Sequence, residues 1–111
     1  MDEGQRTTLV LVDVRDADGT MWRAVTLTED GGLAILGHDI GPGIERIFGG
    51  SEYEFERRLS AAEVSTLHQL LDVAADGDLL TAIHDRFRST RDLETFAEEH
   101  GIAGQFWNRI G

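Results

Sequence analysis

The chain has 111 residues, of which 21 are acidic and 10 are basic, giving a formal net charge of −11. This length suits a single hydrophobic core, so we expect residues 1–111 to form one domain. The sequence has no cysteine, which excludes disulfides and thiolate metal sites. No apolar run approaches the ~20 residues that cross a bilayer, and the acidic, polar start is not typical of a signal peptide. These features predict a cytoplasmic protein.

All ten basic residues are arginines. Without lysine, Schiff-base chemistry and a P-loop lysine are excluded. A strongly negative chain repels nucleic acid and anionic membranes and attracts basic proteins. We therefore expect a basic protein partner and no nucleic-acid or membrane partner.

The first half of the sequence predicts strands. A Leu- and Val-rich run is followed by Asp18-Gly19, a strong hairpin signal, and a second turn is expected at residues 30–32. Tight turns between successive strands favour an antiparallel meander. The expected sheet has four strands, at about 7–16, 21–29, 33–40 and 52–59.

The second half predicts helices. Ser60 and Glu63 have the spacing of a capping box, and apolar residues then recur at helical intervals. Gly101 stands where a glycine often ends a helix. The expected fold class is α+β, with C-terminal helices packed on one sheet face. Their expected ranges are about 61–75, 78–88, 91–100 and 103–109.

Residues 37–50 form a glycine-rich loop that contains the only proline of the chain. Gly41 and Gly43 flank Pro42 and predict a sharp turn, and residues 43–48 are compatible with one helical turn ended by Gly49-Gly50. The apolar side chains of this loop favour a structural role, whereas Asp39 and Glu45 are candidates for contact with a partner. Whether the loop is functional or structural stays open at this point.

The segment EYEFERRL, residues 52–59, alternates strongly. Strand geometry places Glu52, Glu54 and Glu56 on one side in a row, roughly 7 Å apart. This row is either a solvated surface paired with arginines such as Arg15 or Arg23, or a docking strip for a basic protein. We predict partner contacts by Asp39, Glu45, Glu52, Tyr53, Glu54 and Glu56.

The sequence favours no catalytic centre. The four histidines lack a metal-ligating spacing, and the adjacent His38 and Asp39 point to opposite sides of a strand. The stretch GHDIGPG opens no long helix and fails the dinucleotide-binding fingerprint. We expect a protein that is not an enzyme, with no catalytic residue, metal or cofactor.

The C-terminal stretch FAEEHGIAGQFWNRI imitates a helix-turn-helix motif. The would-be recognition helix has one cation, Arg109, and the preceding helix is acidic, which opposes phosphate binding. The interpretation is a helix pair packed on the sheet. Phe106 and Trp107 are expected mainly in the core, with Trp107 partly exposed.

The pattern GHDIG…FGGSEYEFERRLSAAEVSTLHQLL, together with HGIAGQFWNRIG, resembles small bacterial α+β proteins of actinobacterial type, some of which are immunity proteins of polymorphic toxins. The resemblance covers roughly residues 20–111 and brings no catalytic residue. It implies an inhibitor whose carboxylates replace the phosphates of a nuclease toxin's substrate, with no cofactor.

Three functions follow, in order of preference. The first is an acidic, immunity-type inhibitor of a basic toxin such as a nuclease. The second is a structural module that self-associates through a sheet edge or the Phe106-Trp107 end. The third is a small enzyme or ligand-binding domain that uses the glycine-rich loop, with a pocket near His38 and Asp39.

Overall fold

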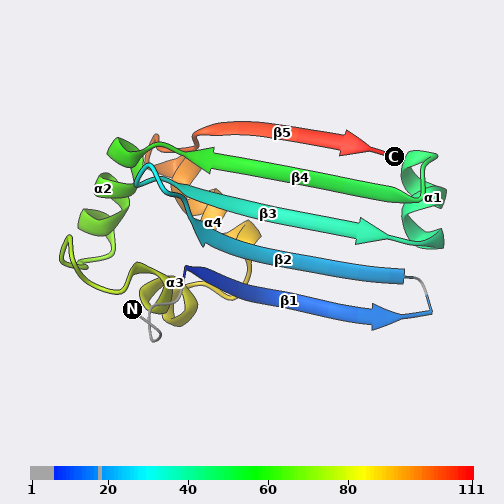
Figure 1. Cartoon of the computed structure of the whole chain (residues 1–111), viewed down its shortest axis with the longest axis horizontal. Helices are drawn as coiled ribbons and strands as arrows, with labels where there is room; N and C mark the ends of the chain where they lie inside the picture. Colours follow the sequence, from blue (N-terminus) through cyan, green and yellow to red (C-terminus); the bar gives the residue numbers. More distant parts are fainter. Residues whose placement is uncertain (1–6, 18) are drawn as a thin grey trace.

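The computed structural model describes residues 7–17 and 19–111, apart from the side chains of Glu45, Ile47 and Phe48. It is an α+β fold with one antiparallel sheet whose strands follow chain order (Figure 1). The strands are β1 (Thr8–Asp16), β2 (Gly19–Leu27), β3 (Leu33–Ile40), β4 (Glu52–Leu59) and β5 (Gln105–Ile110). The helices are α1 (Pro42–Phe48), α2 (Ala61–Leu70), α3 (Leu79–Arg86) and α4 (Thr90–Glu99).

The meander of the first four strands is confirmed, but the helix expected at 103–109 is wrong. That segment is β5, which pairs antiparallel with β4 from Tyr53↔Ile110 to Arg58↔Gln105. Its apolar residues fit a helical spacing and a strand alternation equally well, so the local pattern does not decide between them. The segment forms a strand because β4 would otherwise have an unpaired edge, and β5 provides hydrogen-bond partners for the backbone groups of β4. The predicted turn at Asp18-Gly19 includes Asp18, which lies outside the described residues.

Two predicted signals at helix ends are confirmed, the capping box at Ser60 and the glycine at position 101. Ser60 Oγ accepts from the Glu63 N–H at 3.2 Å, and Glu63 Oε1 accepts from the Ser60 N–H at 2.8 Å, completing the capping box. The other Glu63 oxygen accepts from the Gly104 N–H at 3.2 Å, which ties α2 to the turn before β5. Gly101 has a φ of 74°, as expected for a glycine that ends a helix. The first long helix stops at Leu70, earlier than predicted.

One hydrophobic core joins helices and sheet. Its sheet members alternate along the strands and therefore share one face, here called the helix-side face. Figure 1 places α2, α3 and α4 together at the end of the sheet where β1 begins, and α1 at the opposite end. The fully buried members include Val25, Leu33, Ile35, Leu59, Leu67, Leu80, Ile83 and Leu93.

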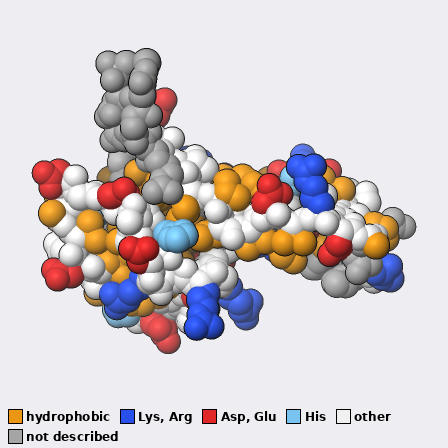
Figure 2. Space-filling view, turned by 90° about the horizontal axis from the view of Figure 1, so that it is seen from below, with side chains coloured by type: hydrophobic (Ala, Val, Ile, Leu, Met, Phe, Trp, Pro, Cys, Tyr) orange, Lys and Arg blue, Asp and Glu red, His pale blue; other side chains and the backbone are white. Residues whose placement is uncertain are grey.

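The sheet continues well beyond this core. The molecule measures 44 × 32 × 24 Å, and Figure 2 shows a thick end joined to a thinner arm with hydrophobic side chains along it. None of the helices in the described part of the chain is long and apolar enough to cross a membrane. Among the side chains that the structure describes, seven large hydrophobic ones are 42–53% exposed, namely Val10, Val14, Met21, Ile40, Phe106, Trp107 and Ile110.

Candidate functional site: the uncovered part of the sheet

The candidate site is the arm of the sheet that extends past the core. It presents the outer part of the helix-side face, the opposite face (here called the open face) and the edge of β5. The strand register assigns side chains to the two faces. The cross-strand row Trp22, His38, Glu54 and Arg109 lies on the open face, and the row Arg23, Gly37, Phe55 and Asn108 on the helix-side face.

The glutamate row (Glu52, Glu54 and Glu56) lies along the open face, as the alternation predicts. Each carboxylate has a basic neighbour. Glu52 Oε2 lies 2.5 Å from His38 Nε2, Arg109 Nη2 donates to Glu54 Oε1 at 2.5 Å, and Arg58 Nε donates to Glu56 Oε2 at 2.9 Å. Two carboxylates of the row, Glu54 and Glu56, are therefore paired with arginines of the sheet, and Glu52 contacts an imidazole.

The two arginines suggested as partners of this row are elsewhere. Arg23 lies on the helix-side face and binds Asp39, and Arg15 lies 3.9 Å from Asp13 in β1. Pairing with arginines, one of the two interpretations of this row, is found for Glu54 and Glu56, but the partners are Arg109 and Arg58. Arg109 could not be predicted as a partner, because its segment was expected to form a helix and not the strand β5.

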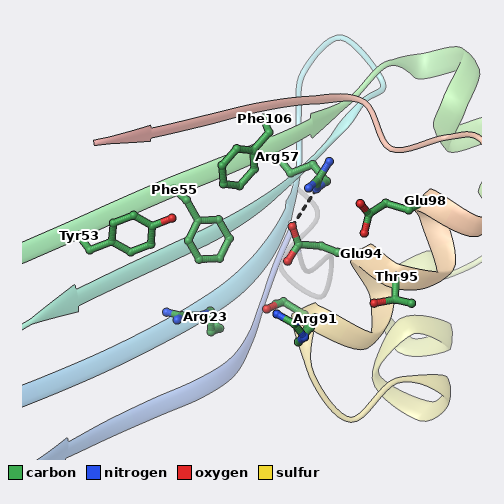
Figure 3. Close-up of a pocket in the computed structure, with 10 residues that line it drawn as sticks. Arg23, Tyr53, Phe55, Arg57, Arg91, Glu94, Thr95, Glu98 and Phe106 are labelled. Carbon is green, nitrogen blue, oxygen red and sulfur yellow. Dashed lines mark hydrogen bonds and ion pairs between the residues drawn. The ribbon is translucent and has the colours of Figure 1, made fainter. Parts of the chain in front are cut away.

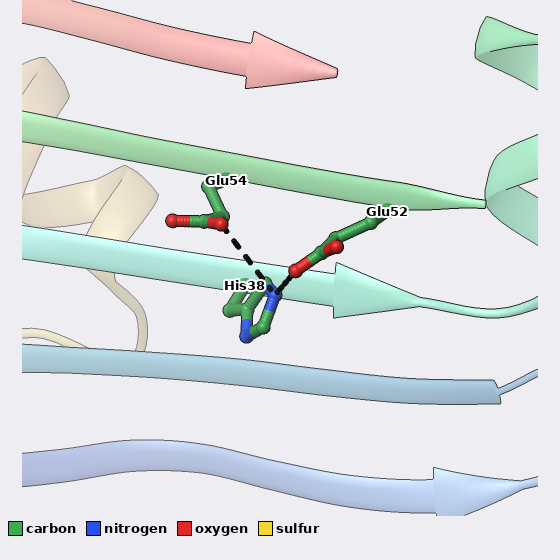
Figure 4. A group of neighbouring side chains, drawn as sticks. All are labelled: His38, Glu52 and Glu54. Carbon is green, nitrogen blue, oxygen red and sulfur yellow. Dashed lines mark hydrogen bonds and ion pairs between the residues drawn. The ribbon is translucent and has the colours of Figure 1, made fainter. Parts of the chain in front are cut away.

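His38, Glu52 and Glu54 form a cluster on β3 and β4 (Figure 4). One donor atom from each lies within 4.8 Å of the other two, and His38 Nε2 is 4.0 Å from Glu54 Oε1. An imidazole nitrogen with two carboxylate oxygens is a donor set that can coordinate a divalent cation such as Zn²⁺. The spacing along the chain gave no sign of this cluster, because the β3–β4 register places His38 opposite Glu54.

A groove of about 380 Å³ lies on the helix-side face, between β4, β5 and α4 (Figure 3). Three aromatic rings follow one another along it: Tyr53 and Phe55 are 6.0 Å apart, and Phe55 and Phe106 are 5.9 Å apart, centroid to centroid. We call this the aromatic groove. Its opposite wall is made by α4 side chains, namely Thr90, Arg91, Glu94, Thr95 and Glu98.

Two arginines are held at fixed positions in the aromatic groove. Both oxygens of Asp39 accept from Arg23, at 2.6 and 3.0 Å, and the guanidinium lies 5.0 Å from the Phe55 centroid. Arg57 donates to Glu94 at 2.8 Å and lies 5.1 Å from the Phe106 centroid. These ion pairs and cation–π contacts pre-organise the aromatic wall.

The predicted contact residues do not form one patch. Asp39 and Tyr53 lie on the helix-side face, and the glutamate row lies on the open face. Asp39 is only 7% exposed, so its main contact is Arg23. Glu45 belongs to α1, and its side chain lies outside the described part of the structure.

Three comparisons with known proteins found no match to this chain: no protein-family model, curated protein or solved structure matches it.

The negative charge is concentrated away from the glutamate row. Residues 60–104, which include α2, α3 and α4, contain nine acidic residues and three arginines, a net charge of −6. The other described residues contain nine acidic residues and six arginines, a net charge of −3. The strongest attraction for a basic partner therefore comes from the helical end.

A second cavity, of about 430 Å³, lies beside the glycine-rich loop. Asp39 lines it, as the third functional hypothesis expects of a pocket here, whereas His38 is not among its lining residues. The Asp39 carboxylate is already bound to Arg23. The other walls of this cavity are mainly apolar and include Val14, Met21, Ile40 and Ile44.

Proposed function

We propose that this chain is a non-enzymatic protein-binding domain of the cytoplasm that inhibits a basic partner, in the manner of an immunity protein. The observation that supports this most directly is the uncovered arm of the sheet. Of its exposed hydrophobic side chains, those of Val14, Met21, Phe106 and Ile110 lie on the same face as the pre-organised aromatic groove. Exposed apolar clusters of this kind on small proteins commonly mark interaction surfaces.

The net charge supports a basic partner. An overall charge of −11 favours rapid, salt-sensitive encounter with a positively charged protein, at rates up to ~10⁸–10⁹ M⁻¹s⁻¹ at low salt. A nuclease toxin is the partner class suggested by the resemblance described above. In this proposal the helical end steers the encounter and the aromatic groove provides the apolar contact.

The aromatic groove offers anchors of the type that dominate interface energies. Phe106 is about half exposed, and Tyr53 is partly buried in the same wall. Tyr and Arg, both present in this groove, are enriched among binding hot spots. The glutamate row lies on the other face, so contact with both would require a partner that wraps around β5.

The first test is capture of a partner from the cells that carry this gene. The tagged chain is used as bait at low salt and at high salt, and bound proteins are identified by mass spectrometry. We expect one basic protein, recovered at low salt and reduced at high salt. Recovery of the bait alone at low salt would contradict the proposal.

The second test locates the contact surface once the partner is purified. We expect Phe106→Ser to weaken binding at least ~10-fold, mainly through faster dissociation. Replacing Glu52, Glu54 and Glu56 with Gln should slow association and flatten its salt dependence. Replacing Asp72, Asp76 and Asp85 with Asn removes the same charge from the helical end, and it should slow association at least as much, because that end steers the encounter in this proposal. Equal affinity of all variants would contradict a contact surface on the arm.

A further inference from the structure

The two edges of the sheet differ in how well they are protected from pairing. β1 is interrupted by an irregularity between Val10 and Val12 and carries Asp13 and Asp16. β5 pairs with β4 in unbroken register, has no acidic residue or proline, and is exposed at every position. Unprotected edge strands readily pair with another strand. β5 is therefore the edge of the sheet that is open to pairing.

The backbone geometry identifies the groups that β5 offers. Glu52 and Gly111 exchange both backbone hydrogen bonds, at 3.2 and 2.8 Å. In an antiparallel ladder such pairs occur at every second residue, so Trp107 and Arg109 also point their backbone groups toward β4. It follows that the N–H and C=O groups of Phe106, Asn108 and Ile110 point outward.

We propose that β5 binds the β5 of a second copy of this chain, antiparallel, across a two-fold axis at Asn108. Opposite residues in an antiparallel pair share a face, so each pair joins residues of the same alternation class. Centring on Asn108 places Phe106 opposite Ile110 of the second copy, and Asn108 opposite itself. This register uses every outward backbone group of β5, with about six hydrogen bonds between the copies.

The competing register is centred on Trp107. It places Ile110 opposite Gly104 of the second copy, and Gly104 has a φ of 69°, outside the range of a strand. This arrangement leaves about four hydrogen bonds and no partner strand for Ile110. The axis at Asn108 is therefore preferred.

The side chains of β5 are also self-complementary in this register. On the helix-side face, Phe106 meets Ile110 of the second copy and extends the aromatic groove. On the open face, Trp107 lies opposite Arg109 of the second copy, a pairing suited to a cation–π contact. These contacts cover three side chains that are 48%, 53% and 48% exposed in the single chain, Phe106, Trp107 and Ile110.

The charge of the chain gives this dimer a distinctive salt dependence. Two copies with a net charge of −11 each repel one another, while the pairing strands contain only Arg109 as a charged residue. Salt screens the long-range repulsion and leaves the apolar and backbone contacts in place. Added salt should therefore strengthen the dimer, whereas it should weaken the binding of a basic partner.

Sedimentation equilibrium over a range of concentrations tests for the dimer. We expect a reversible dimer that tightens at high salt. Ile110→Lys should weaken it at least ~10-fold by placing a charge in the interface. Val14→Lys is the matched control, because Val14 is similarly exposed on the same face at the opposite edge, and it should leave the affinity unchanged. A monomer at all concentrations, or equal effects of both substitutions, would overturn the proposal.

Engineered cysteines test the register. Because the chain has no cysteine, Asn108→Cys introduces a single thiol that lies opposite its own copy on the axis, at a Cα separation of about 5.5 Å. Mild oxidation should convert this variant to a disulfide-linked dimer. Arg15→Cys, on the other edge, should remain unlinked. Linking of Arg15→Cys, or failure of Asn108→Cys to link, would overturn the β5 interface with its axis at Asn108. Circular dichroism verifies that each variant is folded.

Discussion

At the scale of single residues, the Arg23–Asp39 pair shows how the structure changes the role of a predicted contact residue. The Asp39 carboxylate holds Arg23 in a bidentate pair, and Arg23 Nη1 also donates to the Trp22 carbonyl at 2.8 Å. The side chains of Arg23 and Asp39 are 18% and 9% exposed. Asp39 therefore acts on the aromatic groove indirectly, by holding Arg23 at the Phe55 ring.

Removing Asp39 should destabilise the fold, because it leaves a largely buried guanidinium without its counter-charge. We expect Asp39→Ala to lower the free energy of unfolding by about 2–4 kcal/mol in urea denaturation at neutral pH. Asp13→Ala breaks the exposed Asp13–Arg15 pair and should change it by less than about 0.5 kcal/mol. Similar losses of unfolding free energy for both variants would show that the buried pair stabilises the fold no more than the exposed pair does.

Asp30 provides the clearest expected effect of pH. Its hydrogen bond from Thr28 Oγ1, together with that from the Gly32 N–H, holds the pKa of the Asp30 carboxyl below its usual value of 3.8. Because the folded pKa is lowered, the stabilisation is present above pH 3.8 and is lost as the pH falls through the folded value. NMR titration of Asp30 should give a midpoint below 3.8, and Thr28→Val should raise it. A midpoint unmoved by Thr28→Val would assign the shift to another group.

At the scale of elements, the alternation of β4 is the feature that organises the arm. It places the glutamate row on one face and Tyr53, Phe55 and Arg57 on the other. The neighbouring strand is adapted to this pattern. Gly37 of β3 lies opposite Phe55, and a Cβ at Gly37 would overlap the Phe55 ring. Gly37 thus makes room for the central ring of the aromatic groove.

Filling that space should displace the ring. We expect Gly37→Ala to lower the free energy of unfolding by about 1–3 kcal/mol, as overpacked sites do. In a Phe55→Ala background the same substitution should cost much less, since the overlapping ring is gone. A double-mutant cycle in urea measures this coupling. Additive effects would mean that Gly37 is needed for a reason other than Phe55.

At the scale of the whole molecule, packing is strongly uneven along the long axis. The core lies at the helical end with α2, α3 and α4, whereas α1 lies at the far end of the arm (Figure 1). Stability should follow this gradient, because local opening is easiest where few apolar contacts are broken.

Hydrogen exchange can measure this gradient within one strand. The amides of Ile35 and Asp39 both lie in β3 and belong to the same alternation class, but Ile35 is in the core and Asp39 is in the arm. We expect the Ile35 amide to exchange more slowly, by on the order of 10-fold or more. Equal rates would show that the sheet opens only as a unit.

The local pattern of the sequence determined the α+β class, the order of the first four strands, the capping box at Ser60 and the separation of the glutamate row from Tyr53, although β2 begins and ends two residues earlier than predicted. These features depend on neighbours in the chain, through alternation, turn residues and caps. Only the tertiary structure decided the state of residues 103–109, the cluster of His38 with Glu52 and Glu54, the Arg23–Asp39 pair and the exposure of Phe106 and Trp107. Each of these depends on which strands are neighbours in the sheet and on how far along the sheet the helices pack. Those contacts join residues far apart in sequence, and no local periodicity encodes them.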